Sequence, residues 1–175
     1  MSIIPDPLHP AVVHFPIVLI LLGTLAAVVA VFWHKEYVPA LAAVLMVLGS
    51  LGAWAAVATG ESDGGLVENT SAGAALLLEA HENWAKRTLT AAALAATFAV
   101  GSAVLFRFPR AARGMAVAAA LAAGAASWLV FETGHRGGAL VYQHGAGVNT
   151  LSTASAGENQ GAAPTPKPRT TADRD

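Results

Sequence analysis

The residues of this sequence best suited to chemistry are its histidines. The chain has six histidines and no cysteine. Imidazole nitrogens suit haem iron, copper and zinc, whereas the lack of thiols excludes disulfides, iron–sulfur clusters and covalent haem attachment by this chain. No HExxH or other compact zinc pattern is present, so a site must combine histidines that are distant in sequence. One histidine, His34, lies in a polar turn. The other five are the candidates: His9, His14, His81, His135 and His144.

Two of these histidines lie in the opening motif LHPAVVHFPIVL, residues 8–19. His9 and His14 are five residues apart and fall on different faces of a regular helix. Pro16 leaves a backbone carbonyl without its helical partner, which predicts a kink. His14 lies deeper in the apolar run, where an unpartnered polar group costs more. We therefore predict His14 as a ligand ahead of His9, opposite His81 or, next, His135 or His144.

Two carboxylates lie close to candidate ligands in the sequence. Glu132 precedes His135 by three residues, and Glu82 directly follows His81. A carboxylate that accepts the second ring N–H often supports a ligating histidine. Glu82 also suits a surface ion pair with Lys86, four residues on. Glu132 ends an apolar run, where a charge is costly unless it is paired.

The composition predicts the elements that must position these side chains. Hydrophobic residues make up 55% of the chain and charged residues 12%, with a mean hydropathy of +0.55. A soluble domain carries about 25% charged residues, so the chain is predicted to be a membrane protein. The net charge of −1 gives no basic excess for nucleic acid. Four apolar runs approach the roughly 20 residues that a membrane-crossing helix needs: about 11–33, 38–58, 84–106 and 113–133.

These runs predict an all-α integral membrane protein with a four-transmembrane-helix bundle. From about Ser71, the segment before span three reads as an extra helix that lies in the interface or runs on into that span. Residues 1–148 form the predicted membrane domain. Residues 149–175 are rich in Pro, Ala and Thr, and this composition predicts a flexible tail.

Basic residues predict the orientation. Lys35 lies in the first short turn, and Arg107, Arg110 and Arg113 lie in the turn between spans three and four. The positive-inside rule then places both short turns in the cytoplasm and both termini in the periplasm. The five candidate histidines would all lie at the external end of the bundle. Three cations oppose this orientation: Lys86, Arg87 and Arg136.

Four motifs resemble a bacterial family of small predicted membrane proteins, domain of unknown function 2231. They are LHPAVVHFPIVL, TGESDG, HENW and GGALVYQHGAGV, spread in order over about residues 5–150. The resemblance implies a four-span bundle with its histidines on one side, and it carries over His9, His14, His81 and His144, then His135. Relatives are sometimes joined to c-type cytochrome domains, which implies redox work outside the cytoplasm. This chain has no CxxCH motif, and the family has no established activity to transfer.

Together these observations favour an electron-transfer subunit of the bacterial inner membrane, which binds b-type haem through histidines at its external face. Besides the lipid bilayer, its expected partners are other membrane subunits or a c-type cytochrome. One alternative is a structural or assembly subunit of a larger respiratory or photosynthetic complex, without a cofactor of its own. A copper or zinc site is the third. No catalytic residues are predicted.

Overall fold

A computed structural model of the chain describes residues 9–33, 35–68 and 72–145. The described residues form helices and connections, with no strand. The predicted tail, 149–175, and His34 lie outside them. The helices are α1 (His9–Val12), α2 (His14–Phe32), α3 (Tyr37–Glu68), α4 (Ala72–Val104) and α5 (Pro109–His144).

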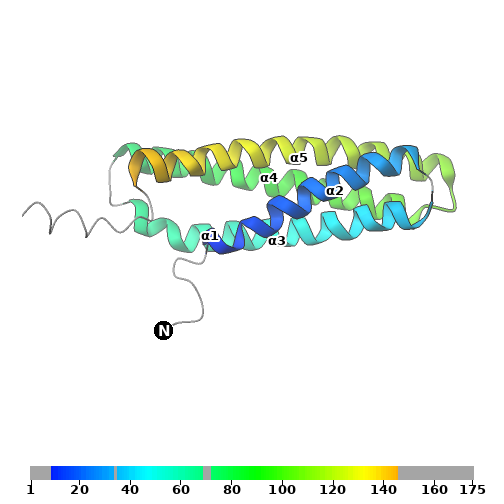
Figure 1. The fold of residues 1–175 in the computed structure, drawn as a ribbon, viewed down its shortest axis with the longest axis horizontal. Coiled ribbons are helices and arrows are strands. Elements are labelled where there is room, and N and C mark those ends of the chain that lie inside the picture. Colours follow the sequence, from blue (N-terminus) through cyan, green and yellow to red (C-terminus); the bar gives the residue numbers. More distant parts are fainter. Residues whose placement is uncertain (1–8, 34, 69–71, 146–175) are drawn as a thin grey trace, which may run out of the picture.

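The four long helices form an elongated bundle in which the chain runs up and down (Figure 1). Each long helix packs against the next one along the chain, and α2 also packs against α5, which closes the ring. The short helix α1 packs against α3. We call the end with the α2–α3 and α4–α5 connections the turn end, and the opposite end, where α1 and the last turns of α5 lie, the histidine end (Figure 1).

Four helical segments are long and apolar enough to cross a membrane: His9–Phe32, Tyr37–Ser62, Ala72–Val104 and Pro109–His144. The predicted all-α, four-span fold is therefore confirmed. The last three spans are longer than the predicted 38–58, 84–106 and 113–133. The segment after Ser71 takes the second predicted alternative and runs on into span three, as the first part of α4. The glycine-rich segment after residue 133 likewise continues α5.

Small residues bring the helices close together. A Cβ added at Gly23 would lie 2.6 Å from the Met46 sulfur, and one at Gly49 would lie 3.0 Å from Ile20 Cγ1. Without a hydrophobic drive between helices in lipid, such close approach is a main source of association. The largest buried cluster is almost entirely alanine: Ala26, Ala27, Ala42, Ala43, Met46, Ala95, Ala96, Ala99, Ala119 and Ala123.

The first helical segment is broken at Val13, between α1 and α2. Pro16 cannot donate a backbone hydrogen bond to Val12, which weakens the ladder at this point. Pro16 is buried against α3, where a Cβ at Gly52 would lie 3.2 Å from its Cδ. His9 precedes Pro16 by seven residues, or about two helical turns, and so faces the same neighbour. The break and this spacing turn His9 toward α3.

Candidate metal centre at the histidine end

His9 and His81 form the central contact of the histidine end. The two ring centroids are 6.3 Å apart, and the ring planes are nearly perpendicular at 89°. His9 lies 23 residues before the end of α2, and His81 lies 23 residues before the end of α4. At about 1.5 Å per residue, both rings are roughly 35 Å from the turn end. This distance slightly exceeds the about 30 Å of hydrocarbon in a bilayer.

Backbone carbonyls fix the protonation of both rings. His9 Nδ1 donates to the carbonyl of Ala56 at 2.8 Å and is 3.3 Å from the hydroxyl of Thr59. His81 Nδ1 donates to the carbonyl of Thr133 at 3.0 Å. A carbonyl oxygen only accepts, so Nδ1 carries the hydrogen and a neutral ring has its lone pair on Nε2. A ligating histidine typically donates its second N–H in this way.

Two glycines make room for the two rings. A Cβ at Gly60 in α3 would lie 3.0 Å from His9 Cε1. A Cβ at Gly137 in α5 would lie 3.1 Å from His81 Cε1. Each ring therefore packs directly against the backbone of a neighbouring helix. These glycines were not singled out from the sequence, although each continues the inward face of its helix.

Threonines join α4 to α5 beside His81. The hydroxyls of Thr88 and Thr133 are 3.0 Å apart. Each hydroxyl is also within hydrogen-bond distance of a carbonyl one turn earlier in its own helix, that of Trp84 for Thr88 and that of Leu129 for Thr133. Because each hydroxyl has a single hydrogen, one of the two donates to its carbonyl and the other donates across to its partner. Since the carbonyl of Thr133 accepts from His81, one residue links the ring to the hydroxyl pair. This arrangement satisfies polar groups that would be costly to leave unpaired in an apolar setting.

The charged groups of this region pair with each other rather than with histidines. Glu132 forms an ion pair with Arg136, at 2.5 Å and with both side chains about one-quarter exposed. The Arg136 guanidinium lies over Trp84, 4.2 Å from the ring centroid. Glu132 was predicted to support His135, and Glu82 to support His81. The structure instead pairs Glu132 with Arg136 and gives the Nδ1 of His81 a carbonyl partner.

The other three candidate histidines do not join the His9–His81 pair. His14 and His135 are exposed on the outer surface of the bundle. His144 is half-buried against α4, where a Cβ at Gly73 would lie 3.3 Å from its ring, farther out than His81. The structure therefore places His9, and not His14, beside His81, while the ligand role of each stays a prediction. The reason is geometric, since five helical residues turn the side chain by about 140°, and the inward face goes to His9.

Two imidazoles are a small ligand set. No group of three or more histidine, aspartate or glutamate side chains in the described part of the chain could hold a metal ion together. A structural zinc site normally needs four protein ligands. Haem iron needs few ligands from the protein, because the macrocycle supplies the others. The pair therefore suits haem iron or a copper ion of low coordination number better than structural zinc.

Comparison with known proteins agrees with the membrane architecture. Residues 5–150 match the family described as "Predicted membrane protein (DUF2231)". No match was found among curated proteins or among solved structures. The match covers all the described helices, the His9–His81 pair included. The chain thus belongs to the predicted membrane protein family DUF2231.

Proposed function

We propose that this protein is an integral membrane electron-transfer subunit, in which His9 and His81 bind the iron of a b-type haem. The observation that supports this proposal most directly is the pair of neighbouring imidazoles, in a T-shaped arrangement and each with its Nδ1–H held by a carbonyl. A bound haem would supply reversible one-electron chemistry. The protein would supply the two ligand nitrogens and hold their rings in place.

The spacing of the two rings fits a shared metal ion. Imidazole nitrogens bind metals at about 2.0–2.1 Å, and a ring centroid lies about 1 Å beyond its nitrogen. The 6.3 Å between the centroids of His9 and His81 is within the range at which two imidazoles would hold one ion.

The level of the pair along the bundle supports exchange with a partner outside the bilayer. Both rings lie about 35 Å from the turn end by the helical rise, near the membrane surface. We further propose that this surface is the periplasmic face of a bacterial inner membrane, with both termini on that side. A c-type cytochrome or another membrane subunit would then be the electron partner.

The orientation has its own test, which the lack of cysteine makes simple. A single cysteine is introduced at Ser2 or at Ala111, and intact cells are treated with a membrane-impermeant thiol reagent. The proposal predicts labelling at position 2 and protection at position 111. Labelling at 111 with protection at 2 would invert the topology and move the histidine pair to the cytoplasmic side.

The haem proposal is tested by the spectrum of the purified wild-type protein. A sharp α band and a Soret shift in the reduced-minus-oxidised spectrum are expected. Metal analysis of the same sample distinguishes the copper or zinc alternative, which would give one of these metals without a haem spectrum. A colourless and metal-free preparation contradicts both.

A second candidate is a structural or assembly subunit of a larger membrane complex. One observation favours it: among the described residues, no buried side-chain nitrogen or oxygen is left without a hydrogen-bond partner. The polar network at the histidine end is thus satisfied by protein groups. This candidate predicts a colourless protein that still co-purifies with other membrane subunits, and whose co-purification survives loss of His81.

A further inference from the structure

A shallow groove runs along the outward face of α4, away from the His9–His81 pair. Its volume is about 410 Å³. Its lining residues recur every three or four positions and so share one face of the helix. We call it the α4 groove, and it is lined by Asn83, Lys86, Arg87, Thr90, Ala91 and Leu94.

The chemistry of the α4 groove changes along its length. Asn83 lies 21 residues before the end of α4, about 32 Å from the turn end, whereas Leu94 lies 10 residues before it, about 15 Å from that end. The groove therefore extends from the level of the lipid headgroups to near the middle of the bilayer. Its polar and cationic residues come first, and Ala91 and Leu94 follow toward the apolar centre.

The two cations at the upper end are held in place by neighbours. Lys86 Nζ is 2.8 Å from a carboxylate oxygen of Glu61 in α3. The Arg87 guanidinium lies over Trp84, 5.3 Å from the ring centroid. Among the residues that the structure describes, Arg87 forms no ion pair with a carboxylate. Arg87 is 17 residues before the end of α4, about 26 Å from the turn end, and its long side chain can extend from there to the headgroups.

We propose that the α4 groove binds one phospholipid with an anionic headgroup, such as phosphatidylglycerol. The phosphate would lie near Arg87 and Lys86, and an acyl chain would cover Ala91 and Leu94. Zwitterionic lipids carry the same phosphate, but the added cation on their headgroup opposes the Arg87 guanidinium, whereas Lys86 already pairs with Glu61. One basic residue near the membrane surface raises the binding constant for an anionic lipid about fivefold. This proposal does not depend on the haem proposal.

Native mass spectrometry of the full-length protein tests it. The protein is equilibrated in micelles that contain equal amounts of phosphatidylglycerol and phosphatidylcholine, and the ratio of the two bound lipids is measured. Wild type should retain phosphatidylglycerol in excess by about fivefold or more. The double variant Lys86→Gln with Arg87→Gln should bring this ratio close to one. The matched control, Arg110→Gln with Arg113→Gln at the turn end, should leave the excess unchanged.

Two further arms separate a lipid seat from simple attraction of anions. Ala91→Leu keeps both cations but fills the groove, so it should also lower the excess. Millimolar inorganic phosphate should not displace the bound lipid, since it lacks an acyl chain. The proposal is overturned if wild type binds both lipids equally or if the turn-end control removes the excess instead. It also fails if Ala91→Leu has no effect or if free phosphate displaces the lipid.

Discussion

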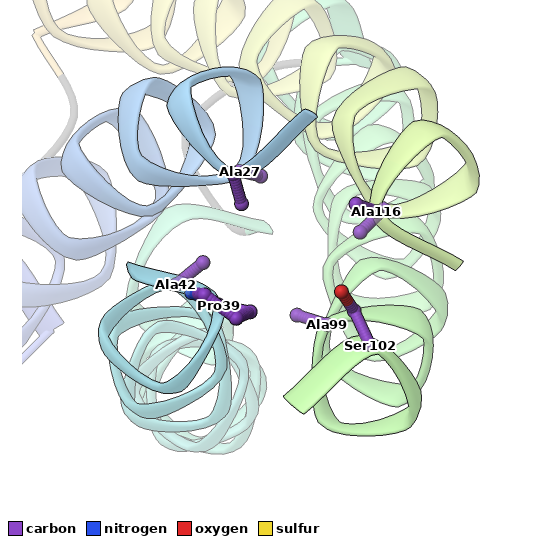
Figure 2. A pocket seen from close by; sticks show the side chains of 8 residues that line it. Ala27, Pro39, Ala42, Ala99, Ser102 and Ala116 are labelled. Atoms are coloured by element: carbon purple, nitrogen blue, oxygen red, sulfur yellow. The ribbon is translucent and has the colours of Figure 1, made fainter. Parts of the chain in front are cut away.

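The two ends of the bundle interior are built from opposite kinds of residue. At the turn end, the interior contains a narrow apolar gap lined mainly by alanines, among them Ala27, Ala42, Ala99 and Ala116 (Figure 2). Ser102 also lines it and donates its hydroxyl hydrogen to a backbone carbonyl. The gap is too small for a water molecule. At the histidine end, the helices are instead joined by the rings of His9 and His81 and by the hydroxyls of Thr88 and Thr133. The ion pair between Glu132 and Arg136 lies at the same end.

This contrast separates stability from chemistry. Alanines hold helices together by close approach alone, which is effective in lipid and leaves nothing for a ligand to bind. Histidine rings between helices need hydrogen-bond partners and space, which Gly60, Gly137 and the two carbonyls provide. Such an arrangement costs more to build than an apolar one. Its restriction to one end supports a role at one membrane surface.

The largest stability effect is expected at the turn end. Ala99 is 1% exposed, and Ala99→Leu should destabilise the bundle by about 1–3 kcal/mol, because overpacking forces the helices apart. Thermal unfolding in detergent, followed by circular dichroism, measures this. Ala93→Leu, on the exposed face of the same helix, is the matched control. Equal unfolding temperatures for the two variants would contradict the tight packing described for this end.

A smaller effect is expected from the glycines beside the rings. Gly137→Ala places a Cβ 3.1 Å from His81 Cε1, and the displaced ring should cost about 0.5–1.5 kcal/mol. Gly124→Ala is the control, since nothing lies within 4 Å of its Cβ. There, the higher helix propensity of alanine should leave stability unchanged or raise it by up to about 1 kcal/mol. Similar unfolding temperatures for both variants would show that Gly137 is not needed to seat the ring.

The smallest effect is expected from the threonine pair. Thr88→Val removes a hydrogen bond between α4 and α5, and such bonds contribute about 0.6 kcal/mol in membrane proteins. Thr97→Val removes only a bond within α4 and serves as the control in the same unfolding assay. A loss as large as that of Ala99→Leu would reverse the proposed division of roles between the two ends.

The sequence was sufficient to predict the four spans, because long runs of apolar residues with few charges are typical of membrane-crossing helices. It was less informative about where α4 and α5 begin and end. The predicted span four ended at about residue 133, yet the inward face of α5 continues through the glycines that follow, at spacings of three and four. Buried or inward-packed positions follow one another from Ala126 through Thr133, Gly137 and Leu140 to His144. His135 does not fit this periodicity and so lies off the inward face of α5. The periodicity could have been recognised in the sequence.

The choice between His9 and His14 could not be made from local sequence alone. Their spacing already indicated that only one faces inward. Which one does so depends on the packing of α1 against α3, a contact between segments almost fifty residues apart. His14 was predicted to be the inward-facing ligand because it lies deeper in the apolar run. The spacing of seven between His9 and the buried Pro16 was the better signal.

Ligation of a haem iron by His9 and His81 is tested most directly by the reduced-minus-oxidised spectrum of three purified variants, compared with wild type at equal protein content. His9→Ala and His81→Ala should each lose the low-spin α band, whereas His14→Ala should keep it because His14 is exposed on the outer surface. An unchanged haem spectrum in His9→Ala, or its loss in His14→Ala alone, would contradict the assignment of His9 and His81 as the two ligands.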